Sequence, residues 1–252
     1  MKGLLTVILA LHCSLSAAAE SVSIPTPRGS TIEVIADFPI GAGPFTTVIL
    51  APGQGYHMRL AALEQTARRL VEEGIAVYRF DWTYYTATPR GSPSQDFGLE
   101  IEDMNTVVAL AVADSRVDSS RVWAAGKSLG SSVAWHVLRA NRTLRGGVLL
   151  TPVCSQVESA GAAPVAIHDY YYPDVSAETR PLVFAQGDAD PLCSTPILYG
   201  LMADLSAPTR LLVVGGDHSF EGLPRAEGNA LDENLQAVAD FVALAVADFS
   251  AD

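Results

Sequence analysis

Gly126-Lys127-Ser128-Leu129-Gly130 is the stretch of sequence that decides the fold. It follows the apolar run Arg121–Ala125, which is typical of a buried strand, and precedes Ser131–Leu138, which is typical of a helix. A Gly-x-Ser-x-Gly pattern at such a junction predicts a nucleophile elbow, a turn so tight that its serine adopts a strained backbone conformation. The pattern therefore predicts an exposed Ser128 hydroxyl beside a helix N-terminus, where developing negative charge is stabilised.

The composition fits one globular domain. The chain has 252 residues, of which 49% are hydrophobic, enough for a sizeable core and too many for a disordered chain. The formal net charge of −12 argues against nucleic acid as a partner and against electrostatic attachment to an anionic membrane. We therefore expect a small molecule as the partner.

The first residues are typical of a secretory signal peptide. A short basic start is followed by the apolar stretch Leu4–Leu11, too short to span a bilayer, and by the small residues Ala17–Ala19. This pattern predicts a signal peptide at residues 1–19 and a single domain at residues 20–252. We expect an exported protein, periplasmic or secreted, without a membrane anchor. A lipoprotein anchored through Cys13 is the weaker reading, because a histidine precedes that cysteine.

Strands and helices alternate along the rest of the chain. The first two strands, at Ser21–Ile24 and Thr31–Phe38, predict a hairpin. The later strands are expected at Thr46–Ala51, Ala76–Phe80, Arg121–Ala125, Gly146–Leu150, Pro181–Ala185 and Arg210–Val214. Helices are expected at Leu60–Glu73, Phe97–Ser115, Pro196–Ser206 and Leu231–Phe249, besides the helix that follows Ser128. The order predicts an α/β fold with a mostly parallel doubly wound sheet and an antiparallel N-terminal hairpin.

Acidic residues and a histidine follow two later strands. Asp188 and Asp190 come after one strand, and Asp217 and His218 after the next. A serine hydroxyl needs a base to take its proton, and the base needs a buried carboxylate to orient it. We expect Ser128 as nucleophile, His218 as base, and Asp188 or Asp190 as the acid. Asp217 is a weaker candidate, because a residue adjacent to the histidine usually points elsewhere.

The glycine-rich turn after the strand at Thr46–Ala51 predicts an oxyanion hole. Its backbone N–H groups, above all that of Gln54, are free to point at an oxyanion, and the N–H of Leu129 is the expected second donor. The residues expected to contact substrate near this turn are Gly53, Gly55, Tyr56 and Trp82.

The segment Ser155–Arg180 has no convincing helical pattern, so we expect little or no cap over the site. The aromatic residues near the strand ends could serve either for packing or for lining the pocket; they are Trp82, Tyr84, Tyr85 and Tyr170–Tyr172.

Two cysteines, Cys154 and Cys193, remain once the signal peptide is removed. Export favours a disulfide between them, and two unrelated buried thiols are the alternative. No His, Cys and carboxylate cluster has metal-ligand spacing, so we expect no metal and no cofactor. Lys127 is the one lysine after the signal peptide. It could pair with a carboxylate and steady the turn, or point to solvent.

The chain resembles the α/β-hydrolase superfamily over nearly its whole mature length. More narrowly, it is similar to the hydrolase-like domain shared by a testis-expressed protein and a subunit of the NSL chromatin complex, a group similar to dienelactone hydrolases. The residues that carry the resemblance are Gly53–Met58, Tyr78–Trp82, Gly126–Gly130, Gln186–Pro191 and Gly216–Ser219. The resemblance implies a triad of Ser128, Asp190 and His218 and favours Asp190 over Asp188.

Together these features predict an exported serine hydrolase that cleaves a carboxylic ester or a related acyl bond through an acyl-enzyme. The alternative is a non-catalytic module that keeps the fold and uses the pocket to bind a ligand or a partner.

Overall fold

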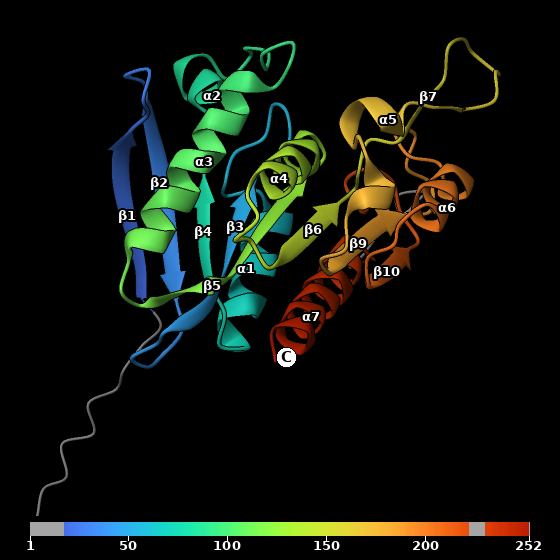
Figure 1. Cartoon of the computed structure of the whole chain (residues 1–252). Helices are drawn as coiled ribbons and strands as arrows, with labels where there is room; N and C mark the ends of the chain where they lie inside the picture. Colours follow the sequence, from blue (N-terminus) through green and yellow to red (C-terminus); the bar gives the residue numbers. More distant parts are fainter. Residues whose placement is uncertain (1–17, 222–229, 252) are drawn as a thin grey trace, which may run out of the picture.

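The core of the protein is an eight-stranded sheet (Figure 1). The structure is a computed structural model that describes residues 18–221 and 230–251. The strand order is β1-β2-β4-β3-β5-β6-β9-β10. Only the pairs β1/β2 and β2/β4 of this sheet are antiparallel. The strands are β1 (Ala18–Pro25), β2 (Thr31–Phe38), β3 (Phe45–Ala51), β4 (Ala76–Phe80), β5 (Val117–Lys127), β6 (Gly146–Leu150), β9 (Leu182–Gly187) and β10 (Thr209–Val214). The mostly parallel sheet and the antiparallel hairpin are as predicted.

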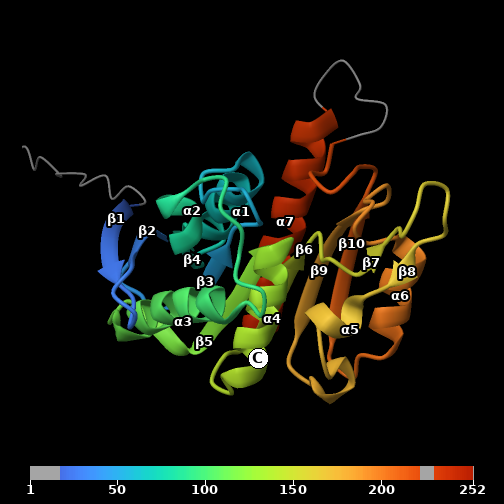
Figure 2. The ribbon, with the colours of Figure 1, turned by 90° about the horizontal axis from the view of Figure 1, so that it is seen from above.

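Helices cover both faces of the sheet (Figure 2). The helices α1 (Ala61–Glu72) and α7 (Ala230–Ser250) pack together on one face, over a core that includes Leu63 and Val242. The other face carries α3 (Gly98–Ala113), α4 (Leu129–Ala140) and α6 (Thr195–Ala203) over a second core. Because both faces are covered, the central strands are mostly apolar; every residue of β6, Gly146–Leu150, is buried.

The connection from β6 to β9 contains only short elements. They are the two-residue strands β7 (Ser155–Gln156) and β8 (Val165–Ala166), the helix α5 (His168–Tyr171) and the 3-10 turn η1 (Val175–Ala177). No large cap covers the site in the described part of the chain, in agreement with the sequence. The segment after β4 begins with a short helix, α2 (Thr83–Ala87).

The predicted signal peptide lies mostly outside the described residues. Ala18 and Ala19, its last two residues, begin β1 and pair with Phe38 and Asp37 of β2. The signal peptide and the domain boundary at residue 20 therefore stay predictions. Within residues 18–221 and 230–251, no helix is long and apolar enough to cross a membrane.

Candidate active site

The turn between β5 and α4 has the geometry of a nucleophile elbow. Ser128 adopts φ 54° and ψ −121°, which a residue with a side chain rarely does. Both flanking glycines are required by close backbone contacts. A Cβ on Gly126 would lie 2.2 Å from the carbonyl carbon of Gly130, and a Cβ on Gly130 would lie 2.5 Å from the carbonyl oxygen of Pro52. The surrounding backbone therefore holds the serine in its strained conformation.

The structure brings Ser128, His218 and Asp190 together in one chain of hydrogen bonds. Each residue follows the carboxyl end of a strand: Ser128 follows β5, Asp190 follows β9 and His218 follows β10. The distance from His218 Nε2 to Ser128 Oγ is 2.8 Å, and that from His218 Nδ1 to Asp190 Oδ2 is also 2.8 Å. The Asp190 side chain is fully buried, whereas 14% of the His218 side chain is exposed. The imidazole can thus accept the serine proton while a carboxylate holds its other nitrogen.

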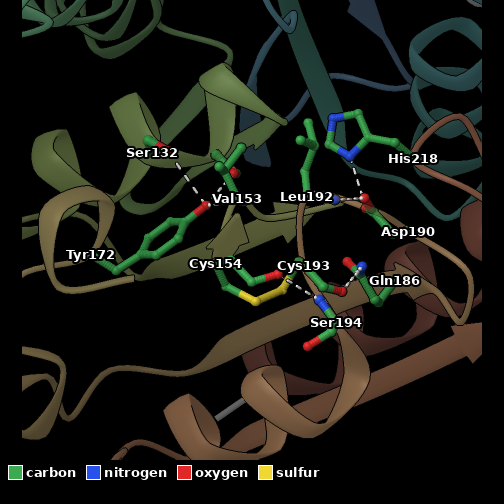
Figure 3. The surroundings of a disulfide bond; sticks show 12 residues. Ser132, Val153, Cys154, Tyr172, Gln186, Asp190, Leu192, Cys193, Ser194 and His218 are labelled. Carbon is green, nitrogen blue, oxygen red and sulfur yellow. Dashed lines mark hydrogen bonds and ion pairs between the residues drawn. A yellow bond between two sulfur atoms is a disulfide. The ribbon is translucent and has the colours of Figure 1, made fainter. Parts of the chain in front are cut away.

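The competing carboxylates shape the two loops instead. Asp188 Oδ1 accepts a hydrogen bond of 3.0 Å from the Gly216 N–H, and Asp217 Oδ1 accepts bonds from the N–H groups of Ser219 and Glu221. Asp190 keeps its orientation because its second oxygen, Oδ1, accepts a 2.8 Å hydrogen bond from the N–H of Leu192 (Figure 3).

The expected oxyanion-hole residues lie on either side of the serine. Leu129 is the first residue of α4, and the N–H groups of a first helical turn have no partner within the helix. A Cβ on Gly53 would lie 3.2 Å from Ser128 Cβ, so the turn that contains Gln54 lies against the serine. Gln54 and Leu129 line the same cavity as Ser128. The arrangement can present two N–H donors to an oxyanion.

The other residues expected to contact substrate, Gly53, Gly55, Tyr56 and Trp82, are not among the residues that line this cavity. Trp82 is fully buried, and its indole N–H donates to the Pro52 carbonyl at 3.0 Å. The Tyr56 ring packs against Gly53, where a Cβ would lie 2.7 Å from Tyr56 Cδ2. Trp82 thus supports the oxyanion turn from within the core.

A cavity of about 480 Å³ opens beside Ser128, within the usual range for small-molecule sites. Its polar lining residues are Gln54, Ser92, Ser94, Gln95, Ser128, Ser155 and Gln156. Its apolar and aromatic lining residues are Pro93, Phe97, Leu129, Val153, Ile167, Tyr170, Tyr171 and Leu192. The sequence left open whether Tyr170 and Tyr171 serve packing or line the pocket, and both line this cavity. Most of the other lining residues were not expected, because no pattern marks which loop residues meet across a sheet edge.

Tyr172 serves packing rather than lining. It is fully buried, and its hydroxyl accepts a 2.9 Å hydrogen bond from the Val153 N–H and lies 2.8 Å from Ser131 Oγ. Burial raises the pKa of the Tyr172 phenol to about 12. The residue connects the first turn of α4 to the loop after β6.

Lys127, directly before Ser128, is buried with 1% of its surface exposed, so of the two alternatives the one in which it points to solvent is wrong. Its Nζ donates to the carbonyl oxygen of His218 at 2.7 Å and to Thr151 Oγ1 at 3.2 Å. Burial lowers the pKa of the Lys127 ammonium to about 8, although the charges of Asp190 and Asp217 raise it.

A disulfide joins Cys154 to Cys193, as predicted (Figure 3). It connects the loop after β6 to the loop after β9, three positions from Asp190. The Cα atoms are 4.6 Å apart, and both cysteines are fully buried.

Comparisons with known proteins agree on the fold. The family model described as "Alpha/beta hydrolase domain" matches residues 44–247. An alpha-beta serine hydrolase homologue from Coxiella burnetii is 21% identical, with a TM-score of 0.66, over 88% of this chain and 95% of that one. An esterase domain from Rhodothermus marinus is 16% identical, with a TM-score of 0.66, over 90% and 97% of the two chains.

A serine hydrolase without a lid from Xanthomonas campestris is 19% identical, with a TM-score of 0.64, over 90% of this chain and 93% of that one. No curated protein sequence matches the chain. The narrower resemblance to the testis-expressed protein and the NSL-complex subunit stays a prediction.

Proposed function

We propose that this chain, which belongs to the α/β-hydrolase family, is a serine hydrolase that cleaves a carboxylic ester or a related acyl bond. The observation that carries the proposal is the pair of 2.8 Å hydrogen bonds through His218, from Ser128 on one side and to Asp190 on the other. A strained serine that is only 7% exposed and lines a cavity, beside a base and a buried carboxylate, is the arrangement that nucleophilic catalysis requires.

In the first step, Ser128 Oγ attacks the ester carbonyl carbon while its proton passes to His218 Nε2. Asp190 stays ionised, fixes the imidazole tautomer and stabilises the imidazolium. The carbonyl oxygen becomes an oxyanion, for which the backbone N–H groups of Leu129 and Gln54 are the proposed donors. The tetrahedral intermediate then collapses, the C–O bond to the alcohol breaks, and His218 returns the proton to the leaving oxygen.

In the second step, water hydrolyses the acyl-enzyme. His218 takes a proton from the water as it attacks the acyl carbon, and gives that proton to Ser128 Oγ as the acid product leaves. Short elements alone separate β6 from β9, so water and substrate can reach the cavity without displacing a large cap.

We also propose that the protein is exported, with cleavage before Glu20. Support comes from the N-terminal pattern of the sequence and from the disulfide, a bond that persists in oxidising compartments. The first residue of the protein recovered from the producing cell is the test. A mature chain that still begins at Met1 would contradict the proposal.

Hydrolysis of a series of 4-nitrophenyl esters, from acetate to octanoate, tests the function. We expect turnover by the native protein, and a kcat lower by a factor on the order of 10⁶ in Ser128→Ala. Ser120→Ala is the matched control, because Ser120 lies exposed near the start of the same strand, β5. Turnover that survives in Ser128→Ala would contradict the proposed role of Ser128. A native protein that hydrolyses none of the esters would favour the ligand-binding module instead.

A further inference from the structure

The cavity beside Ser128 has an uncharged lining. Within the part of the chain that the structure describes, each lining side chain is neutral, including three serines besides Ser128 and three glutamines. Burial raises the pKa of the Tyr171 phenol, so this lining residue also stays neutral. A carboxylate in this cavity would lose part of its hydration without gaining a cationic partner among the described lining residues.

An aromatic cluster forms one side of the cavity. Phe97, buried at the start of α3, stacks on Tyr171 at a centroid distance of 5.9 Å, and Tyr170 meets both rings edge to face. The Tyr170 hydroxyl donates to the Gln95 carbonyl at 2.8 Å, which joins α5 to the loop before α3. This cluster offers apolar contact surface to the part of a substrate beyond its carbonyl group.

We propose that the site takes uncharged esters and discriminates against esters that carry a carboxylate on the acyl chain. The inference rests on the proposed serine hydrolase function and adds the substrate class. The formal net charge of −12 acts in the same direction, because it repels anionic substrates before they reach the cavity.

A matched pair of substrates tests the proposal. 4-Nitrophenyl valerate and mono-4-nitrophenyl glutarate share a leaving group and chain length, and a terminal methyl group replaces a carboxylate. We expect kcat/KM to be at least about 100-fold higher for the valerate, the size of effect that an unpaired, partly dehydrated charge produces.

A cation placed in the cavity is expected to change this preference. Gln95→Arg keeps the backbone carbonyl that Tyr170 uses, so it adds a guanidinium beside the site without removing that contact. This variant should reduce the ratio of kcat/KM for the valerate to kcat/KM for the glutarate about tenfold, mainly because the glutarate is hydrolysed faster. Gln236→Arg, which adds the same charge on the exposed face of α7, is the control and should leave the ratio unchanged.

The outcomes separate the two claims. Comparable kcat/KM values for the two esters, with both activities lost in Ser128→Ala, would overturn the substrate class and leave the proposed function standing. An equal reduction of the valerate-to-glutarate ratio in Gln95→Arg and Gln236→Arg would also overturn the substrate class. The effect of the charge would then not depend on its position in the cavity. Hydrolysis that does not depend on Ser128 would overturn the proposed function and the substrate class together.

The buried Lys127 carries a second, independent inference. Its ammonium holds the backbone of His218, while the hydroxyl of the next residue, Ser128, holds the imidazole of the same histidine. Adjacent residues of the chain thus contact the base at two points. Burying a cation costs free energy, and an apolar side chain of similar length would avoid that cost.

We infer that Lys127 is a positioning residue for the base. Its bond to the His218 carbonyl sets the distance between the loop after β10 and the elbow strand. A displacement of about 1 Å of a reacting group can reduce turnover by a factor on the order of 10². Lys127 does not line the cavity described above, so it should affect turnover rather than substrate binding.

Lys127→Met tests the inference, because methionine keeps the length and removes the donor and the charge. We expect kcat for 4-nitrophenyl valerate to fall by about 10- to 100-fold, with KM changed less than about threefold. In the native protein, kcat should also fall at least about threefold as the ammonium deprotonates between about pH 7.5 and about pH 9.5, since charged donors make stronger hydrogen bonds.

The pH profile of the variant isolates the ammonium. Among the residues that the structure describes, the titratable groups near Lys127 include Asp190, Asp217, His218 and Tyr56, and Lys127→Met keeps all four. A variant with native kcat, or one whose alkaline fall in kcat matches that of the native protein, would overturn the inference. Should the variant not fold, a native kcat that stays flat across this pH range would overturn it as well.

Discussion

Ser128 has a strained backbone conformation that costs about 1–3 kcal/mol. The close backbone contacts of Gly126 and Gly130 maintain this conformation. Two carboxylates, two residues apart in the sequence, are candidates for the acid that contacts His218. Asp190 faces the imidazole from a fully buried position, whereas Asp188 accepts a backbone hydrogen bond from Gly216. Of these two carboxylates, Asp190 is therefore the one placed to orient the imidazole.

Asp190→Asn is predicted to reduce kcat by a factor on the order of 10⁴, because an amide favours the imidazole tautomer that cannot accept the serine proton. Asp188→Asn is the control. Its amide oxygen can still accept the hydrogen bond from Gly216, so we expect a loss in kcat of less than about tenfold. Steady-state kinetics of the two variants checks this, and similar losses in both would contradict it.

The residue pattern alone could order these residues but left Asp188 and Asp190 as alternatives, and only the family resemblance favoured Asp190. The elbow can be predicted from the sequence because so tight a turn requires glycine on both sides of the serine. Asp188 and Asp190 follow the same strand, and the side-chain directions that separate them arise only when the loop after β9 packs against the loop after β10. Lys127 shows the same limit: the sequence marked it as unusual, but its contact with His218 is set by the tertiary fold.

Lys127 also makes stability depend on pH. Its pKa in the folded protein is about 8, below the ordinary value of 10.5, so between these values the unfolded chain binds more protons. The free energy of unfolding therefore rises with pH in this window, by about 2 kcal/mol between pH 8 and pH 10. Urea unfolding of the native protein, compared with Lys127→Met across this range, measures the contribution. A difference between the two that does not change with pH would refute it.

At the scale of elements, the loop after β6 is bonded to the loop after β9, which contains Asp190. Besides the disulfide, the N–H groups of Cys154 and Ser155 both donate to the Leu192 carbonyl at 2.9 Å. Gln186 Nε2 donates to the Cys193 carbonyl, also at 2.9 Å. The position of Asp190 thus rests on several bonds, of which the disulfide is one.

Replacing both cysteines by alanine is predicted to lower the free energy of unfolding by about 4 kcal/mol, from the loop-entropy cost of a 39-residue separation. Because the hydrogen bonds between the loops remain, we expect kcat to fall less than about threefold. Denaturant unfolding without reductant measures the first value, and ester hydrolysis the second. Unchanged stability would contradict the first expectation, and a collapse in kcat the second.

The short elements near the site were beyond sequence analysis for a physical reason. The helix α2 forms from residues of weak helix propensity, because the Thr83 N–H and hydroxyl both donate to Asp103 Oδ2 of α3. The strands β7 and β8 contain two residues each and pair across a loop. Both depend on partners distant in sequence, whereas the long strands and helices were readable from their own periodicity.

At the scale of the whole molecule, the chain has a formal net charge of −12, whereas the described side chains that line the cavity are neutral. We predict that kcat/KM for mono-4-nitrophenyl glutarate rises about two- to fivefold between 10 mM and 300 mM salt, because salt screens the repulsion of an anionic substrate. The value for the neutral valerate should stay constant. Equal salt dependence for both esters would show that the field of the protein does not act on substrate.

The alternation of strands and helices was sufficient to predict a mostly parallel sheet with an antiparallel start. It could not give the strand order, in which β4 lies between β2 and β3, because that depends on crossovers between segments that are not consecutive. The same topology places the ends of β5, β9 and β10 at one edge of the sheet, and this is why three distant residues meet.

The central claim is that Ser128 is an activated nucleophile. Reaction with a fluorophosphonate, followed by mass spectrometry of the intact protein and of its peptides, tests it most directly. The account predicts one adduct per chain, on Ser128, absent from Ser128→Ala and formed much more slowly in Asp190→Asn. A protein that stays unlabelled, or that is labelled equally well after Ser128→Ala, would contradict it.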